Sequence, residues 1–409
     1  MTINTVKRAY KYRFYPTDEQ AQLLARTFGC ARLVYNKALD IRSKAWTNEQ
    51  KNVSSNDVSK LLPEWKKTEE LAFLNEVSSV ALQQSLNHLQ TAFTNFFGKR
   101  AKYPTFKKRA NRQSASFTVA AFSWDESKRE IKLAKTKEPL DIVWSRNIPI
   151  GARISSLTVS RDPAMRWYVS MLAEVDIPTL SKNDKSVGID LGVLRLATLS
   201  DGTEFVNPRS ANHLRTKLVK AQRAHARKAK GSKNREKSRI RVARIHAAIA
   251  DRRHDNLHKV TTQIVRENQT IILEDLNVRG MTSNGGSYKR GLNRAISDAS
   301  FAEFRTMLEY KAKWYGREVV VIDRFYPSSQ LCSSCGNRKK LMLSQRQYEC
   351  DSCGLKLDRD LNAAKNIVAV GLTVLAYGDG MKPSRAKRDN VSVVEVGNPV
   401  EQFAGIPRL

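Results

Sequence analysis

The chain has 409 residues and carries 71 Lys and Arg against 40 Asp and Glu, which gives a formal net charge of +31. This excess favours a polyanionic partner, because Lys and Arg displace the counterions condensed on phosphates. No apolar run reaches the roughly 18–20 residues that span a bilayer, and the N-terminus lacks the apolar core of a secretory signal. We therefore expect several domains, no membrane partner, and a place in the cytoplasm or nucleoid.

The N-terminal region is predicted to begin with a strand and continue as helices. Residues 6–15 alternate basic and apolar side chains, as strands do. The stretch Thr17 to Gln20 then has the pattern of a capping box that opens a helix. Apolar residues recur at the helical period in this helix and again over 76–98. These elements predict a helical block with its own apolar core.

From about residue 115 to 180 the apolar pattern changes to period two, which is typical of antiparallel strands. We expect the N-terminal strand to complete this β unit, so that the helical block is an insertion. A basic turn at 99–109 precedes it, with Tyr103 and Phe106 between cations. These aromatic rings suit stacking on bases, although a solvated loop explains the pattern equally well. The candidate nucleic-acid contacts in this turn are Lys107, Lys108 and Arg109.

Residues 186–205 read as three antiparallel strands with a hairpin turn at Asp201-Gly202. Three such strands with an acid on the first are the opening of an RNase H-like fold. Further strands are predicted at 270–278 and 317–329, with an amphipathic helix at 297–316 between them.

A basic helical stretch covers about 208–267, and we expect residues 231–239 to break it into a hairpin. Residues 211–260 hold 16 Lys and Arg but only three acids. Like charges one helical turn apart repel unless a polyanion lies nearby, so this stretch indicates nucleic-acid contact rather than a solvated face. The candidate contacts here are Lys220, Arg223, Arg227, Lys228, Arg252 and Arg253.

Four of the five cysteines form two C-x-x-C pairs, Cys332/Cys335 and Cys350/Cys353. Two such pairs supply the four thiolates of a tetrahedral zinc site. A glycine follows each pair, where a tight turn needs one. A redox pair is the alternative, but two matched pairs favour one structural Zn²⁺. The fifth cysteine, Cys30, stands alone and is expected to be a small buried apolar residue.

Three acids, Asp190, Glu274 and Asp360, each adjoin an apolar run. Alone, each has an ordinary interpretation as a cap or a helix N-terminus residue. Together they predict converging carboxylates, which repel unless cations such as two Mg²⁺ or Mn²⁺ ions lie between them. Asp275 and Asp358 are neighbouring alternatives. Residues 274 and 275 point to opposite faces of a strand, so only one can face the ions.

The order of motifs GIDLG, LEDLN, PSSQLCSSCG, CDSCG and DRDLNAAKNI resembles that of the TnpB family. These are transposon-encoded, RNA-guided DNA nucleases related to the compact type V CRISPR effectors. The N-terminal YRFYPTDEQ and the YPTFKKR turn are similar to that family as well. The resemblance implies that Asp190, Glu274 and Asp360 are the catalytic, Mg²⁺-binding acids of a split RuvC domain. It also implies a guide RNA from the transposon end, a double-stranded DNA target beside a short flanking motif, and a separate transposase encoded nearby.

The expected fold is therefore multidomain α+β: a β-barrel-like wedge domain with an inserted helical recognition lobe, then a split RuvC (RNase H-like) nuclease domain with an inserted zinc ribbon. The predicted segments are a first wedge segment at 1–15, the recognition lobe at 16–112, a second wedge segment at 113–182, a first RuvC segment with the basic hairpin at 183–329, the zinc ribbon at 330–355, a second RuvC segment at 356–372 and a largely disordered tail at 373–409. The expected function is RNA-guided DNA cleavage. An RNA-guided regulator without cleavage and a transposase that performs strand transfer are the alternatives.

Overall fold

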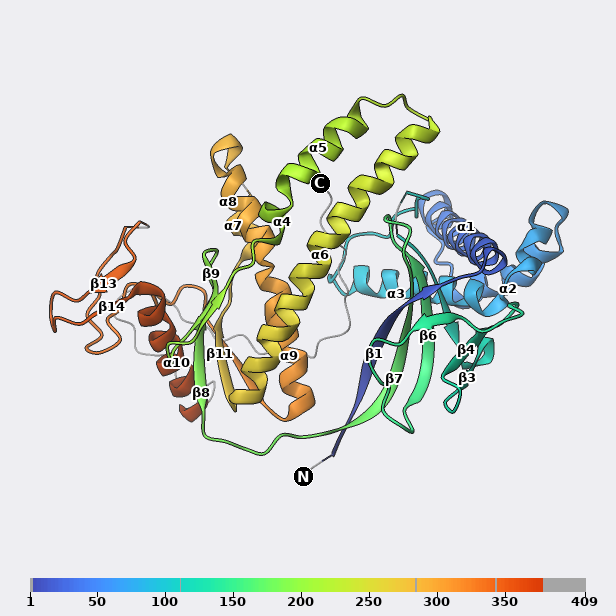
Figure 1. Ribbon diagram of the computed structural model, residues 1–409. Helices are drawn as coiled ribbons and strands as arrows, with labels where there is room; N and C mark the ends of the chain where they lie inside the picture. Colours follow the sequence, from blue (N-terminus) through green and yellow to red (C-terminus); the bar gives the residue numbers. More distant parts are fainter. Residues whose placement is uncertain (1–2, 111, 284, 343, 378–409) are drawn as a thin grey trace. The chain divides into compact units, whose positions relative to one another are not determined.

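A computed structural model describes residues 3–110, 112–283, 285–342 and 344–377 (Figure 1). It divides into two compact units. The C-terminal unit comprises Met1–Asn4, Ile177–Arg223 and Ile245–Leu409, and the N-terminal unit comprises Thr5–Asp176 and Ala224–Arg244. The tip of the basic hairpin, at 224–244, is thus grouped with the N-terminal unit, whereas the sequence pattern predicted the whole hairpin within the nuclease segment.

The N-terminal unit is built on a five-stranded sheet in the order β2-β6-β7-β1-β5. The first strand of the chain lies inside this sheet, as predicted, between strands that follow it by more than a hundred residues. A separate hairpin of two short strands, β3 and β4, lies outside this order. The bounds are β1 Ile3–Tyr15, β2 Gln113–Thr118, β3 Phe122–Asp125, β4 Glu130–Leu133, β5 Asp141–Val143, β6 Arg153–Arg161 and β7 Trp167–Pro178.

The helices between β1 and β2 have their own apolar core, which includes Val34, Leu82 and Leu89. The predicted capping box is present: the Gln20 N–H donates to the Thr17 hydroxyl, and the Gln20 side chain accepts from the Thr17 N–H at 3.1 Å. The helices are α1 Asp18–Glu49, α2 Ser55–Lys67, the 3₁₀ helix η1 Glu69–Glu76 and α3 Ser79–Phe97.

The C-terminal unit is built on a second five-stranded sheet in the order β10-β9-β8-β11-β12. The first three strands along the chain are antiparallel neighbours, whereas β11 runs parallel to both β8 and β12. The bounds are β8 Ser186–Asp190, β9 Arg195–Leu199, β10 Glu204–Val206, β11 Thr270–Glu274 and β12 Glu318–Ile322.

Helices cover both faces of this sheet (Figure 1). On one face, Val187, Ile189, Ile271 and Leu273 belong to a core shared with α6 (Lys233–Glu267) and α9 (Phe301–Tyr315). The alternate residues of β8 and β11 therefore face α10 (Arg359–Tyr377) on the other side.

Helix α10 approaches the sheet so closely that glycine is required at two contacts. A Cβ added at Gly188 would lie 2.2 Å from the Ala364 carbonyl oxygen, and one at Gly371 would lie 2.5 Å from the Ile272 side chain. These two glycines therefore allow the short distance between α10 and strands β8 and β11.

Several helix bounds differ from the predicted ones. The basic stretch breaks at 227–232, which overlaps only the start of the predicted break at 231–239. Gly231 adopts a φ of +82°, and the Ser232 hydroxyl then caps α6 by accepting from the Arg235 N–H. Most of the predicted helix at 297–316 is α9, but its first three residues are the end of another helix, α8 Gly286–Ala299. Ser300, with a φ of +53°, separates the two. The shorter helices are α4 Ser210–His213, α5 Arg215–Ala226 and α7 Val278–Ser283.

Helix α10 continues to Tyr377, five residues beyond the end of the predicted second RuvC segment at residue 372. Residues 373–377 are therefore helical and do not belong to a disordered tail, because apolar side chains such as Val374 extend the pattern that packs on the sheet. The rest of the predicted tail lies outside the described residues. Within the described residues, the helices are too short or too polar to cross a membrane.

Candidate metal centres

The three predicted acids lie at one edge of the second sheet. Asp190 is the last residue of β8 and Glu274 is the last residue of β11, and these parallel strands pair with Ile189 opposite Leu273. By strand alternation, both acids lie on the face covered by α10. Asp360 is in the first turn of α10. The fold thus brings together acids from three distant segments of the chain.

The electrostatics of this cluster are unfavourable for carboxylates alone. Burial raises the pKa of Asp190 to about 8, with the negative charges of Glu274 and Asp360 acting in the same direction. Burial also raises the pKa of Glu274. Carboxylates buried close to one another either take up protons or gather cations, so this edge of the sheet has the chemistry of a site for hard divalent ions.

A hydrogen-bond chain holds Glu274 in place. The Ser328 hydroxyl donates to Glu274 Oε1. The Ser328 carbonyl accepts from the Asn366 side-chain amide of α10 at 2.8 Å, and the same amide donates to the Leu331 carbonyl at 2.7 Å. Because Asn366 is buried, with 6% of its surface exposed, water offers little replacement for these bonds.

The neighbouring acids have other partners. Asp275 points away from Glu274 and forms ion pairs with Arg305 at 2.8 Å and with Arg324. Asp358 caps α10 by accepting from the N–H groups of Asp360 and Leu361.

Arg195 lies against Asp358 at 2.9 Å and approaches Asp360 at 3.6 Å. Although burial opposes ionisation, this guanidinium and the cap bonds lower the pKa of Asp358. Asp275 and Asp358 are therefore accounted for by local ion pairs and a helix cap, which leaves Asp190 and Glu274 as the acids of this edge with a raised pKa.

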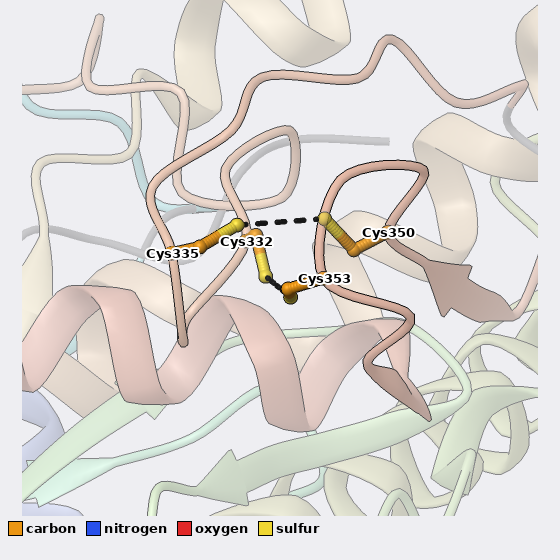
Figure 2. Close-up of side chains that lie close together, drawn as sticks. All are labelled: Cys332, Cys335, Cys350 and Cys353. Carbon is orange, nitrogen blue, oxygen red and sulfur yellow. Dashed lines mark hydrogen bonds between the residues drawn. The ribbon is translucent and has the colours of Figure 1, made fainter.

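The four predicted cysteines form a second centre (Figure 2). The sulfur atoms of Cys332, Cys335, Cys350 and Cys353 all lie within 4.8 Å of one another. Among the described residues, they are the one group of three or more His, Cys, Asp or Glu side chains whose ligand atoms come this close. Four soft thiol ligands at such distances fit a tetrahedral Zn²⁺ ion.

Two matching backbone turns present these cysteines. The Gly336 N–H donates to the Cys332 carbonyl at 2.9 Å, and the Gly354 N–H donates to the Cys350 carbonyl at 3.0 Å. Both glycines have a positive φ, +73° and +72°, which favours glycine over other residues. The short strands β13 (Gln347–Glu349) and β14 (Lys356–Asp358) complete this cysteine ribbon.

Helix α10 also forms hydrogen bonds with the first cysteine turn. The fully buried Asn362 donates to the Leu331 carbonyl at 2.7 Å and accepts from the Ser333 N–H at 2.9 Å. Sequence reasoning did not identify Asn362, Asn366, Ser328 or Arg195 as residues of a site. A partial signal was present, since two asparagines one turn apart on an otherwise apolar helix predict buried side-chain hydrogen bonds.

The predicted nucleic-acid contacts fall on exposed segments, but their surroundings differ. The ammonium of Lys107 lies 4.0 Å from the centre of the Tyr35 ring, and the Lys107 backbone is bonded to Asn36. Arg253 lies 3.7 Å from Asp298. The remaining candidates are exposed: Lys108, Arg109, Lys220, Arg223, Arg227, Lys228 and Arg252.

The two aromatic residues of the 99–109 turn also differ in their contacts. Tyr103 bonds to the Ser43 hydroxyl at 2.8 Å and packs edge-on against Phe93 and Phe96, so it belongs to the helical block. Both rings stay partly exposed, Tyr103 at 44% and Phe106 at 51%.

Comparison with known proteins assigns the chain to a family. Three family models match it: a helix-turn-helix domain of the IS605 OrfB type over residues 1–51, the IS605 OrfB family described as a probable transposase over 168–285, and the Cas12f1-like TNB domain over 301–367. The first of these matches covers the strand β1 and the single long helix α1.

Two relatives align over almost their whole length. A protein of Streptomyces pristinaespiralis named "Putative RNA-guided DNA endonuclease" is 57% identical over 407 residues, covering 99% of both chains. "Putative RNA-guided DNA endonuclease InsQ" of Escherichia coli K12 is 34% identical, covering 92% of this chain and 96% of that protein.

Among solved structures, a Cas12f1–sgRNA–target DNA complex has a protein chain similar in fold, with a TM-score of 0.54 and 14% identity over 89% of this chain and 99% of that one. The fold of this chain is therefore that of the compact Cas12 effectors.

The family model and the two relatives aligned over almost their whole length show the family: the chain belongs to the TnpB family (IS605 OrfB type).

Proposed function

We propose that this protein is an RNA-guided DNA endonuclease associated with a transposon, which cleaves double-stranded DNA next to a short flanking motif. Membership of the TnpB family and the names of the two relatives support this function. The single observation that carries it is the set of Asp190, Glu274 and Asp360 at one sheet edge, with a raised pKa for the two strand acids.

The second sheet and its helices would be the RuvC nuclease domain. Asp190, Glu274 and Asp360 would hold two Mg²⁺ or Mn²⁺ ions, which in such sites activate a water molecule and stabilise the leaving oxygen of a phosphodiester. Ser328 would orient the Glu274 carboxylate, and Arg195 would restrain Asp360 beside the Asp358 cap. The cysteine ribbon would hold one structural Zn²⁺ and brace the start of α10.

The N-terminal unit would contain the wedge domain, with the helices between β1 and β2 as the recognition lobe. In RNA-guided nucleases the choice of target comes from base pairing between guide and target strand, while the protein reads a short motif and binds the nucleic-acid backbone. The basic residues named above would supply such backbone contacts. One nuclease site must cut the two DNA strands in succession, so staggered ends are expected.

Two other functions are alternatives to RNA-guided cleavage, and the experiment below separates them from it. A DNA-binding regulator without cleavage would have no need of three converging acids. A transposase that joins strands itself uses the same fold in other proteins, so fold alone does not separate it from a nuclease. In our proposal a separate transposase would move the element.

The test begins with the RNA that co-purifies when the protein is expressed together with its native downstream DNA. Sequencing should find a discrete structured RNA that ends in sequence adjacent to the transposon. The purified complex should then cut a plasmid that carries the guide-matched target and a randomised flanking region, and sequencing of cut ends gives the flanking motif.

Degraded cellular RNA alone would contradict guided recognition. A discrete RNA with guided binding but no cutting would favour the regulator. Strand-transfer products in place of hydrolysed ends would favour the transposase.

A further inference from the structure

Two histidines on α6 meet a glutamate of α9, within the C-terminal unit. His254 and His258 are one helical turn apart, so their side chains share a face of the helix. Their Nε2 atoms lie 3.0 Å from each other, and the rings are nearly perpendicular, at 89° with centroids 4.4 Å apart. Neither residue is among the acids or cysteines described above.

Glu303 fixes the orientation of the first histidine. His254 Nδ1 lies 2.9 Å from Glu303 Oε1. An ionised carboxylate can only accept a hydrogen bond, so the proton of this contact is on Nδ1. A neutral imidazole has one N–H and one lone pair. The lone pair of His254 is therefore on Nε2, the atom that faces His258.

The contact between His254 and Glu303 is one that metal-binding histidines commonly make. A metal-binding histidine usually donates its other ring N–H to a carboxylate, which sets the tautomer and makes the ligand more basic. Zn–N bonds of about 2.0–2.1 Å with tetrahedral angles place two ligand nitrogens roughly 3.3 Å apart. The observed Nε2 separation of 3.0 Å needs only a small ring movement to reach that value.

We propose that His254 and His258 form a binding site for a divalent transition metal such as Zn²⁺, Ni²⁺ or Cu²⁺, with both Nε2 atoms as ligands and Glu303 as the carboxylate behind His254. Imidazole ligands favour these ions over Mg²⁺ or Ca²⁺. Water completes the coordination, since 54% of the His254 side chain and 41% of the Glu303 side chain are exposed.

The nearby cations do not block the site. Lys259 is paired with Asp255 at 2.7 Å and Arg253 with Asp298 at 3.7 Å, so each has an anionic partner. Lys311 donates to the backbone carbonyl of His258 at 2.8 Å. Without metal, the two imidazoles would share one proton in a water-exposed hydrogen bond, and such bonds contribute only about 0.5–1.5 kcal/mol.

The test is a calorimetric titration of Ni²⁺ into the full-length, tag-free protein with zinc already in the cysteine ribbon. Millimolar Mg²⁺ is present to occupy the carboxylate cluster. The wild type should bind one equivalent of Ni²⁺. His254→Gln and His258→Gln should each lower the affinity for this ion by at least about 10-fold. Glu303→Gln should weaken binding by roughly 10-fold, the usual effect of removing such a carboxylate.

His213→Ala, a change at an exposed histidine of α4, is the matched control and should bind like the wild type. The glutamine variants keep a polar side chain at each position, and circular dichroism checks that they fold. The proposal is overturned if the folded wild type takes up no such equivalent, or if the two glutamine variants bind Ni²⁺ as tightly as the wild type. The titration measures metal uptake alone, so its outcome is independent of the proposed nuclease activity.

Discussion

The carboxylate cluster and the cysteine ribbon are two candidate metal centres built in opposite ways. The cysteines come from one short segment, Cys332 to Cys353, and turns within that segment present them. The acids come from β8, β11 and α10, and only the assembled sheet with its helix brings them together.

Each centre is therefore sensitive to a different kind of change. The cysteine turns have hydrogen bonds of their own, so the ribbon would depend on a bound Zn²⁺ more than on distant packing, as small zinc domains do. The acids depend on packing at a distance, including the close approach of α10 at Gly188. The two centres are nevertheless connected, because Asn366 and Ser328 link the first cysteine turn to Glu274.

Removal of one of the three acids should reduce the cleavage rate most. Asp190→Ala should reduce guided cleavage on the order of 10³-fold or more, because the ions lose a ligand that no neighbour replaces. Guide RNA and target DNA binding should remain. The measurement is the single-turnover cleavage rate beside a gel-shift titration.

Asp275→Asn and Asp358→Asn are the matched controls. Both remove a carboxylate that has arginine partners. Both should therefore lower the thermal stability of the protein, with a much smaller effect on the cleavage rate than Asp190→Ala. Near-wild-type cutting by Asp190→Ala, or a loss as severe in either control, would reassign the catalytic acids.

The next effect tests the ribbon. Cys350→Ser should release one equivalent of zinc and loosen the contacts of Asn362 and Asn366, and cleavage should fall by roughly 10- to 100-fold. Metal analysis by mass spectrometry and the cleavage rate measure the two effects. Ser334→Ala changes an exposed residue of the first cysteine turn and should alter neither. Unchanged folding and cutting in Cys350→Ser would remove the idea that the ribbon supports the nuclease site.

A smaller effect tests the connection between the centres. Ser328→Ala removes the hydroxyl that donates to Glu274, so cleavage should slow by about 10-fold and need more Mg²⁺. Ser328→Thr keeps the hydroxyl and should recover most of the rate. The Mg²⁺ dependence of the single-turnover rate is the measurement. If alanine and threonine behave alike, the hydroxyl does not position Glu274.

The smallest effect is on stability. The pKa of Asp190 is raised to about 8 in the folded protein from its ordinary value of 3.8. Its contribution therefore stabilises the fold at low pH and is lost as pH rises through about 8. In Mg²⁺-free buffer at pH 8.5, Asp190→Asn should raise Tm by about 2–5 °C.

The gain should shrink at pH 5 and when Mg²⁺ is added to the wild type. Thermal unfolding followed by circular dichroism at both pH values provides the measurement. Equal Tm values for variant and wild type at pH 8.5 would mean that burial of Asp190 carries no electrostatic cost.

Local patterns in the sequence determined much of this protein. The capping box at Thr17 and the two cysteine turns depend on residues within a few positions of one another, so their spacing was enough to predict them. Strand alternation alone separated Glu274 from Asp275. These features need no knowledge of what lies across the molecule.

Tertiary structure decided the rest. The partners of Glu274, Asp275 and Asp358 come from residues up to 163 positions away, and no local period encodes such a pairing. Tyr103 packs into the helical block because Phe93 and Phe96 are close in space. The helical conformation of residues 373–377 likewise depends on the sheet, against which Val374 packs. A side chain far along the chain becomes a hydrogen-bond or packing partner only after folding has placed it, and that placement is what makes three separate acids one site.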